Sequence, residues 1–212
     1  MGTHIGGILG NFRGKVGAVI GSKWRGKYVM RGRPDVRKGG KPNPALQQQQ
    51  AKFALMVKFL QPLSLLLQDT YDISPAEMSG MNMALSENIR NAITGAYPAF
   101  AIDYSKIVLS KGGLRNADNV TVASTVAGKL AFTWPDNSGG KTLPTDTAFV
   151  AAYNADQDRW VYREQAASRN AGTYTLDVTA FSGKAVQTYI GFVSADGQTV
   201  SNSLFTGEVN IL

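Results

Sequence analysis

Apolar and polar residues alternate in seven short runs over the C-terminal half of the chain. These runs are rich in Val, Thr, Tyr and Phe, and clusters of Gly, Asn, Asp and Ser separate them. They read VTVAST, KLAFTW, TAFVAAYN, RWVYREQ, GTYTLDVT, AVQTYIGFVS and FTGEVNI. Alternation with a period of two is typical of strands, and evenly spaced short strands are typical of antiparallel sandwiches. We predict an immunoglobulin- or fibronectin-III-like β-sandwich over residues 116–212, with Trp134 and Tyr189 in its core.

A spacing of three and four residues marks the helical region that precedes these runs. Asn43-Pro44 supplies an N-cap residue and a Pro at the first helical position. The apolar positions that follow are Leu46, Phe53, Met56, Leu60, Leu63 and Leu67. Further apolar residues widen this stripe, which predicts burial on more than one side. Pro62 should kink or split the helix. A second helix is predicted over Met81–Thr94, followed by a strand-like run, AIDYSKIVLSKGG.

Two strand-like runs, Val16–Trp24 and Lys27–Arg33, lie near the N-terminus. Arg25-Gly26 between them suits the two-residue turn of a hairpin. Alternation gives the second run a basic face made of Lys27, Arg31 and Arg33. A polar linker rich in Gly and Pro then leads to the first helix. A two-stranded hairpin is not stable alone, so this one needs a sheet to join, either in its own body or in a neighbouring subunit.

Together these patterns predict an α+β fold. Residues 1–115 would hold an N-terminal arm, the β-hairpin and a two-helix unit, and residues 116–212 the sandwich. The length of 212 residues is ample for both parts.

Charge is distributed unevenly along the chain. Met1–Lys41, the N-terminal arm, holds ten Lys/Arg and one acid, whereas the remainder has a net charge of −2. Such an arm suits a polyanion, with cations on phosphates and aromatics on bases, or an acidic neighbour in an assembly. The candidate assembly or polyanion-binding residues are Arg13, Lys15, Lys23, Trp24, Arg25, Lys27, Tyr28, Arg31, Arg33, Arg37, Lys38 and Lys41.

Composition narrows the candidate chemistry. The chain has no cysteine and one histidine, His4, which leaves no disulfide, thiolate site or imidazole metal site. We therefore expect no metal and no cofactor. No apolar run of about 18 residues predicts a membrane span. The N-terminus is a poor signal peptide. We expect the protein in the cytoplasm or within an assembled particle or filament.

Two loops resemble ligand-binding motifs. PDNSGGKT, from Pro135, resembles a phosphate loop, but it has Pro in place of the first Gly and lies between two predicted strands. NADQDRW, from Asn154, begins like a calcium loop, but Arg159 replaces the turn Gly. We interpret both as plain turns.

Enzymatic arrangements find little support in the sequence. A Ser-His-Asp triad would depend on His4, in a glycine-rich terminus that is a poor scaffold for it. The acids Asp103, Glu164 and Asp177 lie in strand-like runs without a distinguishing partner. Aromatics on the sandwich, such as Trp160 and Tyr162, leave a surface- or carbohydrate-binding module as an alternative.

The N-terminal half also carries a resemblance. The pattern GKVGAVIGSKWRGKYVMRGRP, a basic Pro-rich joint, and NPALQQQQAKFALMVKFLQPL resemble an uncharacterised family of Bacteroidetes proteins of about this length. The joint and helix are more loosely similar to small structural proteins of tailed phages. This resemblance implies a fold and leaves the function open.

The leading hypothesis is a non-enzymatic structural protein that self-assembles into a filament, tube or virion-like shell through its arm and hairpin. We expect a homo-oligomer or polymer with no small-molecule substrate. Nucleic-acid binding by the basic hairpin is the main alternative.

Overall fold

The chain forms two compact units, Met1–Asn43 and Pro44–Leu212. The computed structural model describes residues 3–4, 12–24, 26–33, 43–71 and 78–212. The first unit contains the whole N-terminal arm and is called the arm below, and the second is called the body. The predicted boundary at residue 115 falls inside the body. The actual division comes just before the first helix.

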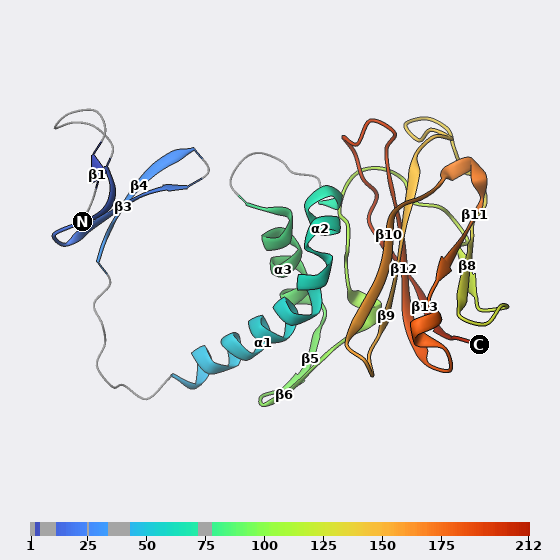
Figure 1. Cartoon of the computed structure of the whole chain (residues 1–212), viewed down its shortest axis with the longest axis horizontal. Coiled ribbons are helices and arrows are strands. Elements are labelled where there is room, and N and C mark those ends of the chain that lie inside the picture. The colour runs from blue at the N-terminus through green and yellow to red at the C-terminus, as the bar shows by residue number, and fades with distance from the viewer. Residues whose placement is uncertain (1–2, 5–11, 25, 34–42, 72–77) are drawn as a thin grey trace. The chain divides into compact units, whose positions relative to one another are not determined.

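The arm is an antiparallel sheet in the order β1-β2-β3-β4 (Figure 1). Its strands are β1 (Thr3–His4), β2 (Phe12–Val16), β3 (Val19–Trp24) and β4 (Lys27–Gly32). β3 and β4 form the predicted hairpin, with Trp24 opposite Lys27 beside the turn. The first predicted run is two strands rather than one, because the chain reverses at Gly17 (φ +57°) and Val16 pairs with Val19. The hairpin is therefore part of a larger meander.

The helices of the body are α1 (Pro44–Leu60), η1 (Gln61–Leu63), α2 (Ser64–Thr70) and α3 (Gly80–Asn91). α1 begins at the predicted Pro44, and the short 3-10 turn η1 at Pro62 separates it from α2, which confirms the predicted break. The side chain of Ser79 caps α3 by accepting a hydrogen bond from the amide of Asn82. α3 ends at Asn91, three residues before the predicted end.

A hairpin follows α3 where a longer helix and a single strand were predicted. It pairs β5 (Ile93–Ala96) with β6 (Ala99–Ile102), so Ile93 is a strand residue. A 3-10 turn, η2 (Tyr104–Lys106), comes next, and the carboxylate of Asp103 caps it by accepting a hydrogen bond from the amide of Ser105. Only the start of the predicted strand AIDYSKIVLSKGG is therefore a strand.

All seven predicted sandwich strands are present. They are β7 (Thr121–Ala123), β8 (Lys129–Thr133), β9 (Thr147–Asn154), β10 (Arg159–Ser168), β11 (Thr173–Asp177), β12 (Ala185–Val193) and β13 (Leu204–Asn210). Two 3-10 turns, η3 (Arg169–Ala171) and η4 (Thr179–Phe181), flank β11. One sheet has the order β10-β9-β12-β13 and the other β11-β8-β7. β10, the fourth of the seven strands, pairs with β9, the third, in the four-stranded sheet, which is an arrangement of fibronectin-III type. The predicted α+β fold is therefore confirmed.

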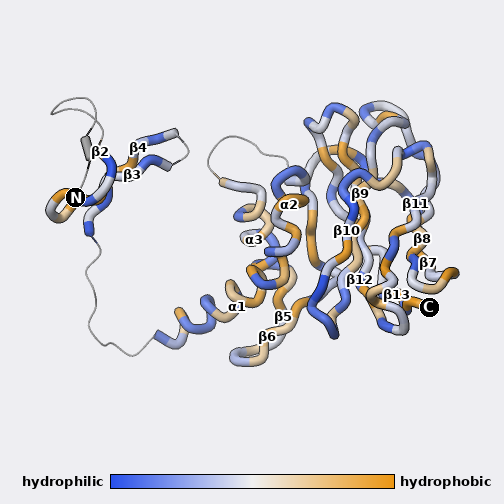
Figure 2. Tube along the Cα trace, in the orientation of Figure 1, coloured by the Kyte–Doolittle hydropathy of each residue, from blue (hydrophilic) through white to orange (hydrophobic). Residues whose placement is uncertain are grey.

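The body has three layers, because the helices cover the outer face of the four-stranded sheet (Figure 1). β9 and β12 are buried along almost their whole length, and Figure 2 shows how apolar this region is. Ala148 and Val150 face the sandwich core, whereas Phe149 and Ala151 face the helices. Trp134 and Tyr189 are buried as predicted, but Tyr189 belongs to the core between helices and sheet. This shared core is why residues 44–212 form one unit.

The first turns of α1 differ from the prediction of burial on more than one side. Leu46 and Phe53 are each 53% exposed. Burial begins at Met56 and continues through Phe59 and Leu60, where α1 reaches the sheet. A wide apolar stripe in the sequence thus includes residues that the body does not cover.

Both motif-like loops are turns, as predicted. The loop from Pro135 leads into strand β9 rather than a helix, and Asn137 accepts a hydrogen bond there from the buried Arg169 (2.6 Å). In the second loop the side chain of Asn154 accepts from the amide of Gln157 (2.8 Å).

Candidate assembly surface

The strand register divides the arm sheet into two faces. Lys15, Ile20 and Arg31 stand opposite one another across β2, β3 and β4. Side chains alternate along each strand, so the register assigns each residue of β2, β3 and β4 to one face. The basic face consists of Arg13, Lys15, Ile20, Ser22, Trp24, Lys27, Val29 and Arg31. The apolar face consists of Phe12, Gly14, Val16, Val19, Gly21, Lys23, Tyr28, Met30 and Gly32.

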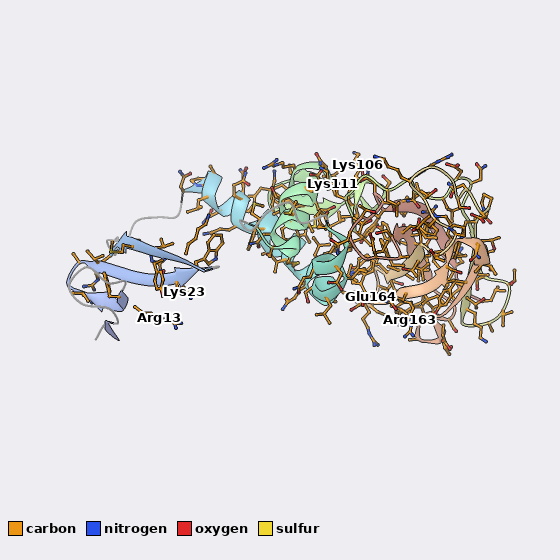
Figure 3. The ribbon with its side chains drawn as sticks, turned by 90° about the horizontal axis from the view of Figure 1, so that it is seen from above. Arg13, Lys23, Lys106, Lys111, Arg163 and Glu164 are labelled. Carbon is orange, nitrogen blue, oxygen red and sulfur yellow. The ribbon has the colours of Figure 1, made fainter. Side chains whose placement is uncertain are left out.

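The basic face gathers most of the predicted residues that the structure describes. Those present on it are Arg13, Lys15, Trp24, Lys27 and Arg31, and Figure 3 labels Arg13 on the sheet. Its cations come from β2 and β4, the two strands that flank β3, which lie about 10 Å apart at a spacing of about 4.8 Å per strand. Trp24 on the central strand is 51% exposed. The face is therefore a positively charged surface with one accessible aromatic ring.

The remaining predicted residues lie elsewhere. Lys23 and Tyr28 are on the apolar face, where the Lys23 Nζ lies 5.4 Å from the centroid of the Tyr28 ring. Arg33 follows β4, and its backbone amide donates to the carbonyl of Ala18 (2.7 Å). Four more are outside the described residues, namely Arg25, Arg37, Lys38 and Lys41.

The apolar face is the feature that sequence reasoning missed. Its large side chains are exposed: Val16 by 55%, Val19 by 39%, Tyr28 by 52% and Met30 by 71%. Lys23 is the one charged residue among its described members. The missed signal was Gly17-Ala18, a two-residue turn that reverses the chain between two valines. If Val16–Trp24 is taken as a single strand, residues of the apolar and basic faces are assigned to the same side.

The arm sheet has no hydrophobic core of its own in the part of the chain described. Gly21 is the only fully buried residue among the arm residues whose burial is described. It owes this to Phe12, since a Cβ added to Gly21 would lie 2.3 Å from the Phe12 carbonyl oxygen and 2.8 Å from its ring. A small sheet that buries so little cannot supply the free energy that orders it. It therefore needs a cover for its apolar face.

A second exposed apolar surface lies on the body. It combines the start of α1, with Leu46 and Phe53, and the tip of the β5–β6 hairpin, where Tyr97 is 47% exposed. The Nζ of Lys52 lies 5.1 Å from the centroid of the Phe100 ring and joins the two elements. We call this surface the α1 patch.

The body also contains a polar cavity of about 620 Å³ between α2, the start of β9 and the loop after β12. Asp69, Tyr71 and Glu164 are among its lining residues. The Tyr71 hydroxyl donates to the carbonyl of Val108 (2.9 Å), and burial raises its pKa, so it does not act as a base. Within the described lining neither carboxylate has a nucleophile or base bonded to it. Figure 3 shows Glu164 and its neighbour Arg163 on this part of the body.

The other acids considered in the sequence have local structural partners. Asp103 accepts hydrogen bonds from Ser105, and these bonds together with Lys106 lower its pKa. Asp177 accepts from the amide and hydroxyl of Thr179, which likewise lowers its pKa. Both therefore stabilise turns. Within the described residues there is no group of three His, Asp or Glu side chains placed to hold a metal ion.

The two aromatics considered for a carbohydrate-binding surface, Trp160 and Tyr162, pack against the core between the helices and the sheet. The Trp160 indole donates to the carbonyl of Phe59 (2.9 Å), and its ring packs edge-on against the Phe59 ring at 5.0 Å. Tyr162 is partly buried against the same core, and burial raises its pKa. Helices cover the face of the sheet on which these rings lie, so Trp160 and Tyr162 are packing residues.

In the part of the chain that the structure describes, no helix is both long and apolar enough to cross a membrane.

A family model matches residues 11–207, which span the arm sheet from near its second strand, the helices and the sandwich. The chain belongs to the Family of unknown function (DUF6266). This membership confirms the resemblance to an uncharacterised family. A search of curated proteins finds no match to this DUF6266 member.

Solved structures similar to the DUF6266 chain match about half of it. The fn3 domain of human collagen alpha-1(XX) chain is 13% identical, with a TM-score of 0.35, over 49% of this chain and 91% of that one. The fn3 domain of human contactin 1 is 9% identical, with a TM-score of 0.33, over 49% and 83%. At these scores the fold assignment rests on the strand order given above.

Proposed function

We propose that this protein is a non-enzymatic structural protein that self-assembles through its N-terminal arm into a filament, tube or virion-like shell. The observation that carries the proposal is the exposed apolar face of the arm sheet. Val16, Val19, Tyr28 and Met30 share one face of a sheet that has no core among its described residues. Such a face requires a partner surface. Other copies of the same chain are present wherever the protein is made, and they can provide it.

The energy available from covering this face is substantial. Full burial of a Val, Met or similar side chain contributes about 1.5–3 kcal/mol. The four large side chains are between 39% and 71% exposed, so covering them would contribute roughly 3–6 kcal/mol. That gain is comparable with the whole stability of a small domain. Assembly and ordering of the arm would therefore be coupled.

The sequence resemblance supports the same proposal. The chain resembles an uncharacterised family of Bacteroidetes proteins, and its joint and first helix are more loosely similar to small structural proteins of tailed phages. A location inside an assembled particle or filament follows from the proposal.

Deletion of residues 1–33 tests the proposal. The body retains both hydrophobic cores, so the truncated protein should stay folded and run as a monomer by light scattering, whereas the full chain should not. A truncated protein that assembles like the full chain would contradict the role of the arm. The double variant Val126→Ser, Leu143→Ser in the full chain is the matched control and should assemble like the wild type, because it removes exposed apolar surface outside both the arm and the α1 patch.

A second candidate function is nucleic-acid binding by the basic face. It is favoured by the cations of β2 and β4 around the exposed Trp24, since phosphates bind cations and bases stack on aromatic rings. The variant Lys15→Ser, Arg31→Ser should then bind single-stranded nucleic acid more weakly and with a shallower salt dependence. Lys106→Ser on the body is the control. Equal affinity for single-stranded nucleic acid in the wild type, the double variant and the control would exclude this function.

A further inference from the structure

We propose that the apolar face of one arm packs against the same face of a second copy, so that two arm sheets form a two-layer sandwich. This inference rests on the proposed function, because it names the contact through which the arm assembles. Sheets that pack face to face lie about 10 Å apart with their side chains interdigitated. The arm sheet has the composition of one half of such a sandwich, apolar on one side and charged on the other.

Charge identifies the face that is covered. The apolar face has one described charge, Lys23, and its ammonium group already lies over the ring of Tyr28. The opposite face carries Arg13, Lys15, Lys27 and Arg31. Pairing through the basic faces would bring like charges together away from water, which is costly. Pairing through the apolar faces leaves every one of these cations in solvent.

The shape of the apolar face suits a second copy of itself. In one row across the sheet Gly14 and Gly21 are followed by Met30, the most exposed of the large side chains on this face. In the next row Val16 and Val19 are followed by Gly32. Large and small residues thus alternate over the face. The Phe12 ring already fills the space over Gly21, whereas a Cβ at Gly32 would meet nothing within 4 Å. A two-fold axis can therefore place a large side chain of each copy over Gly32 of the other.

The area fits a contact that forms reversibly. Three strands of about six residues cover roughly 15 Å by 20 Å, from strand spacings of about 4.8 Å and rises of about 3.4 Å per residue. With side-chain relief this gives about 500 Å² per copy, or about 1,000 Å² in total, at the lower limit for a specific interface. A two-fold contact of this kind closes at two copies, so a larger particle needs a second contact between arm-paired dimers, one too weak to join bodies that lack the arm.

The absence of cysteine makes a direct test available in the full-length chain. Single variants Val19→Cys and Met30→Cys place a thiol on the apolar face, and Val29→Cys places one on the basic face next to Met30. A short bis-maleimide should give a covalent dimer with the first two and not with the third. Because each chain has one thiol, a covalent dimer joins the same position in two copies.

The outcomes separate this inference from the proposed function. Cross-linking confined to the apolar-face variants supports the pairing. If the wild-type protein is larger than a monomer but the apolar-face variants do not cross-link, self-assembly stands and the pairing is wrong. A cross-link obtained only when Met30→Cys is mixed with Phe53→Cys would also overturn the pairing and assign the α1 patch as the partner. Cross-linking of Val29→Cys alone would contradict it as well.

Discussion

Replacement of Phe59 by Ala should destabilise the whole body, because this side chain joins the helices to the sandwich. Phe59 is 2% exposed on α1, and its ring lies 4.8 Å from that of Tyr153 and 5.0 Å from that of Trp160. A buried Phe replaced by Ala costs about 3–5 kcal/mol in lost transfer energy and cavity formation. For a unit of this size, about 2–4 °C in Tm accompany each kcal/mol, so Tm should fall by roughly 6–20 °C.

Urea unfolding of the full-length chain measures this effect with two probes. Far-UV circular dichroism follows secondary structure including the helices, and tryptophan fluorescence follows a set that includes Trp134 in the sandwich core. Both midpoints should shift together, since one core holds the two parts. Phe53→Ala on the same helix is the control, because that side chain is 53% exposed and should cost little.

Separate unfolding of the helices and the sandwich in Phe59→Ala would contradict this prediction. If Phe59→Ala lowered the helical transition alone and left the fluorescence midpoint of the sandwich unchanged, the helices would be a separate module. The boundary near residue 115 would then be a boundary of stability even though the two parts are in contact.

Three further changes have defined outcomes. Arg169→Met should lower the free energy of unfolding by about 3–5 kcal/mol in thermal or urea denaturation, because it removes the cation from a fully buried ion pair. The pKa of Asp158 is lowered mainly by the hydrogen bond from Lys58 and next by that from the Tyr153 hydroxyl. These two bonds to the carboxylate therefore stabilise the folded state at neutral pH, and this stabilisation is lost as the pH falls through the folded-state pKa. Asp158→Asn should thus cost less than about 1 kcal/mol at pH 7, given the exposure of the pair, and almost nothing near pH 2 in matched denaturation curves. Gly21→Val should abolish assembly measured by light scattering, because its Cβ would overlap the backbone and ring of Phe12.

Local patterns in the sequence were sufficient to identify most elements. Period-two alternation located all seven sandwich strands, and Pro44 and Pro62 located the start and break of the helical region. These signals act within a few residues of chain, so they can be read without knowledge of the tertiary structure.

The arrangement of the elements depended on long-range contacts that no local pattern contains. β9 has a continuous apolar run because it is buried on both faces, and the sequence does not say that helices form its second cover. The division after Asn43 was missed for that reason. The candidate surface was half predicted: the cations were found, whereas the apolar face appeared only when the turn at Gly17 split the first strand.

The solution mass of the purified, nuclease-treated full-length chain tests the central claim most directly. Light scattering behind a sizing column measures it without labels or variants. If the chain assembles through its arm, the mass should lie well above the 22.7 kDa of one chain. Removal of residues 1–33 should lower it to the mass of a monomer. A full-length protein that remains a monomer across its range of soluble concentrations would contradict self-assembly through the arm.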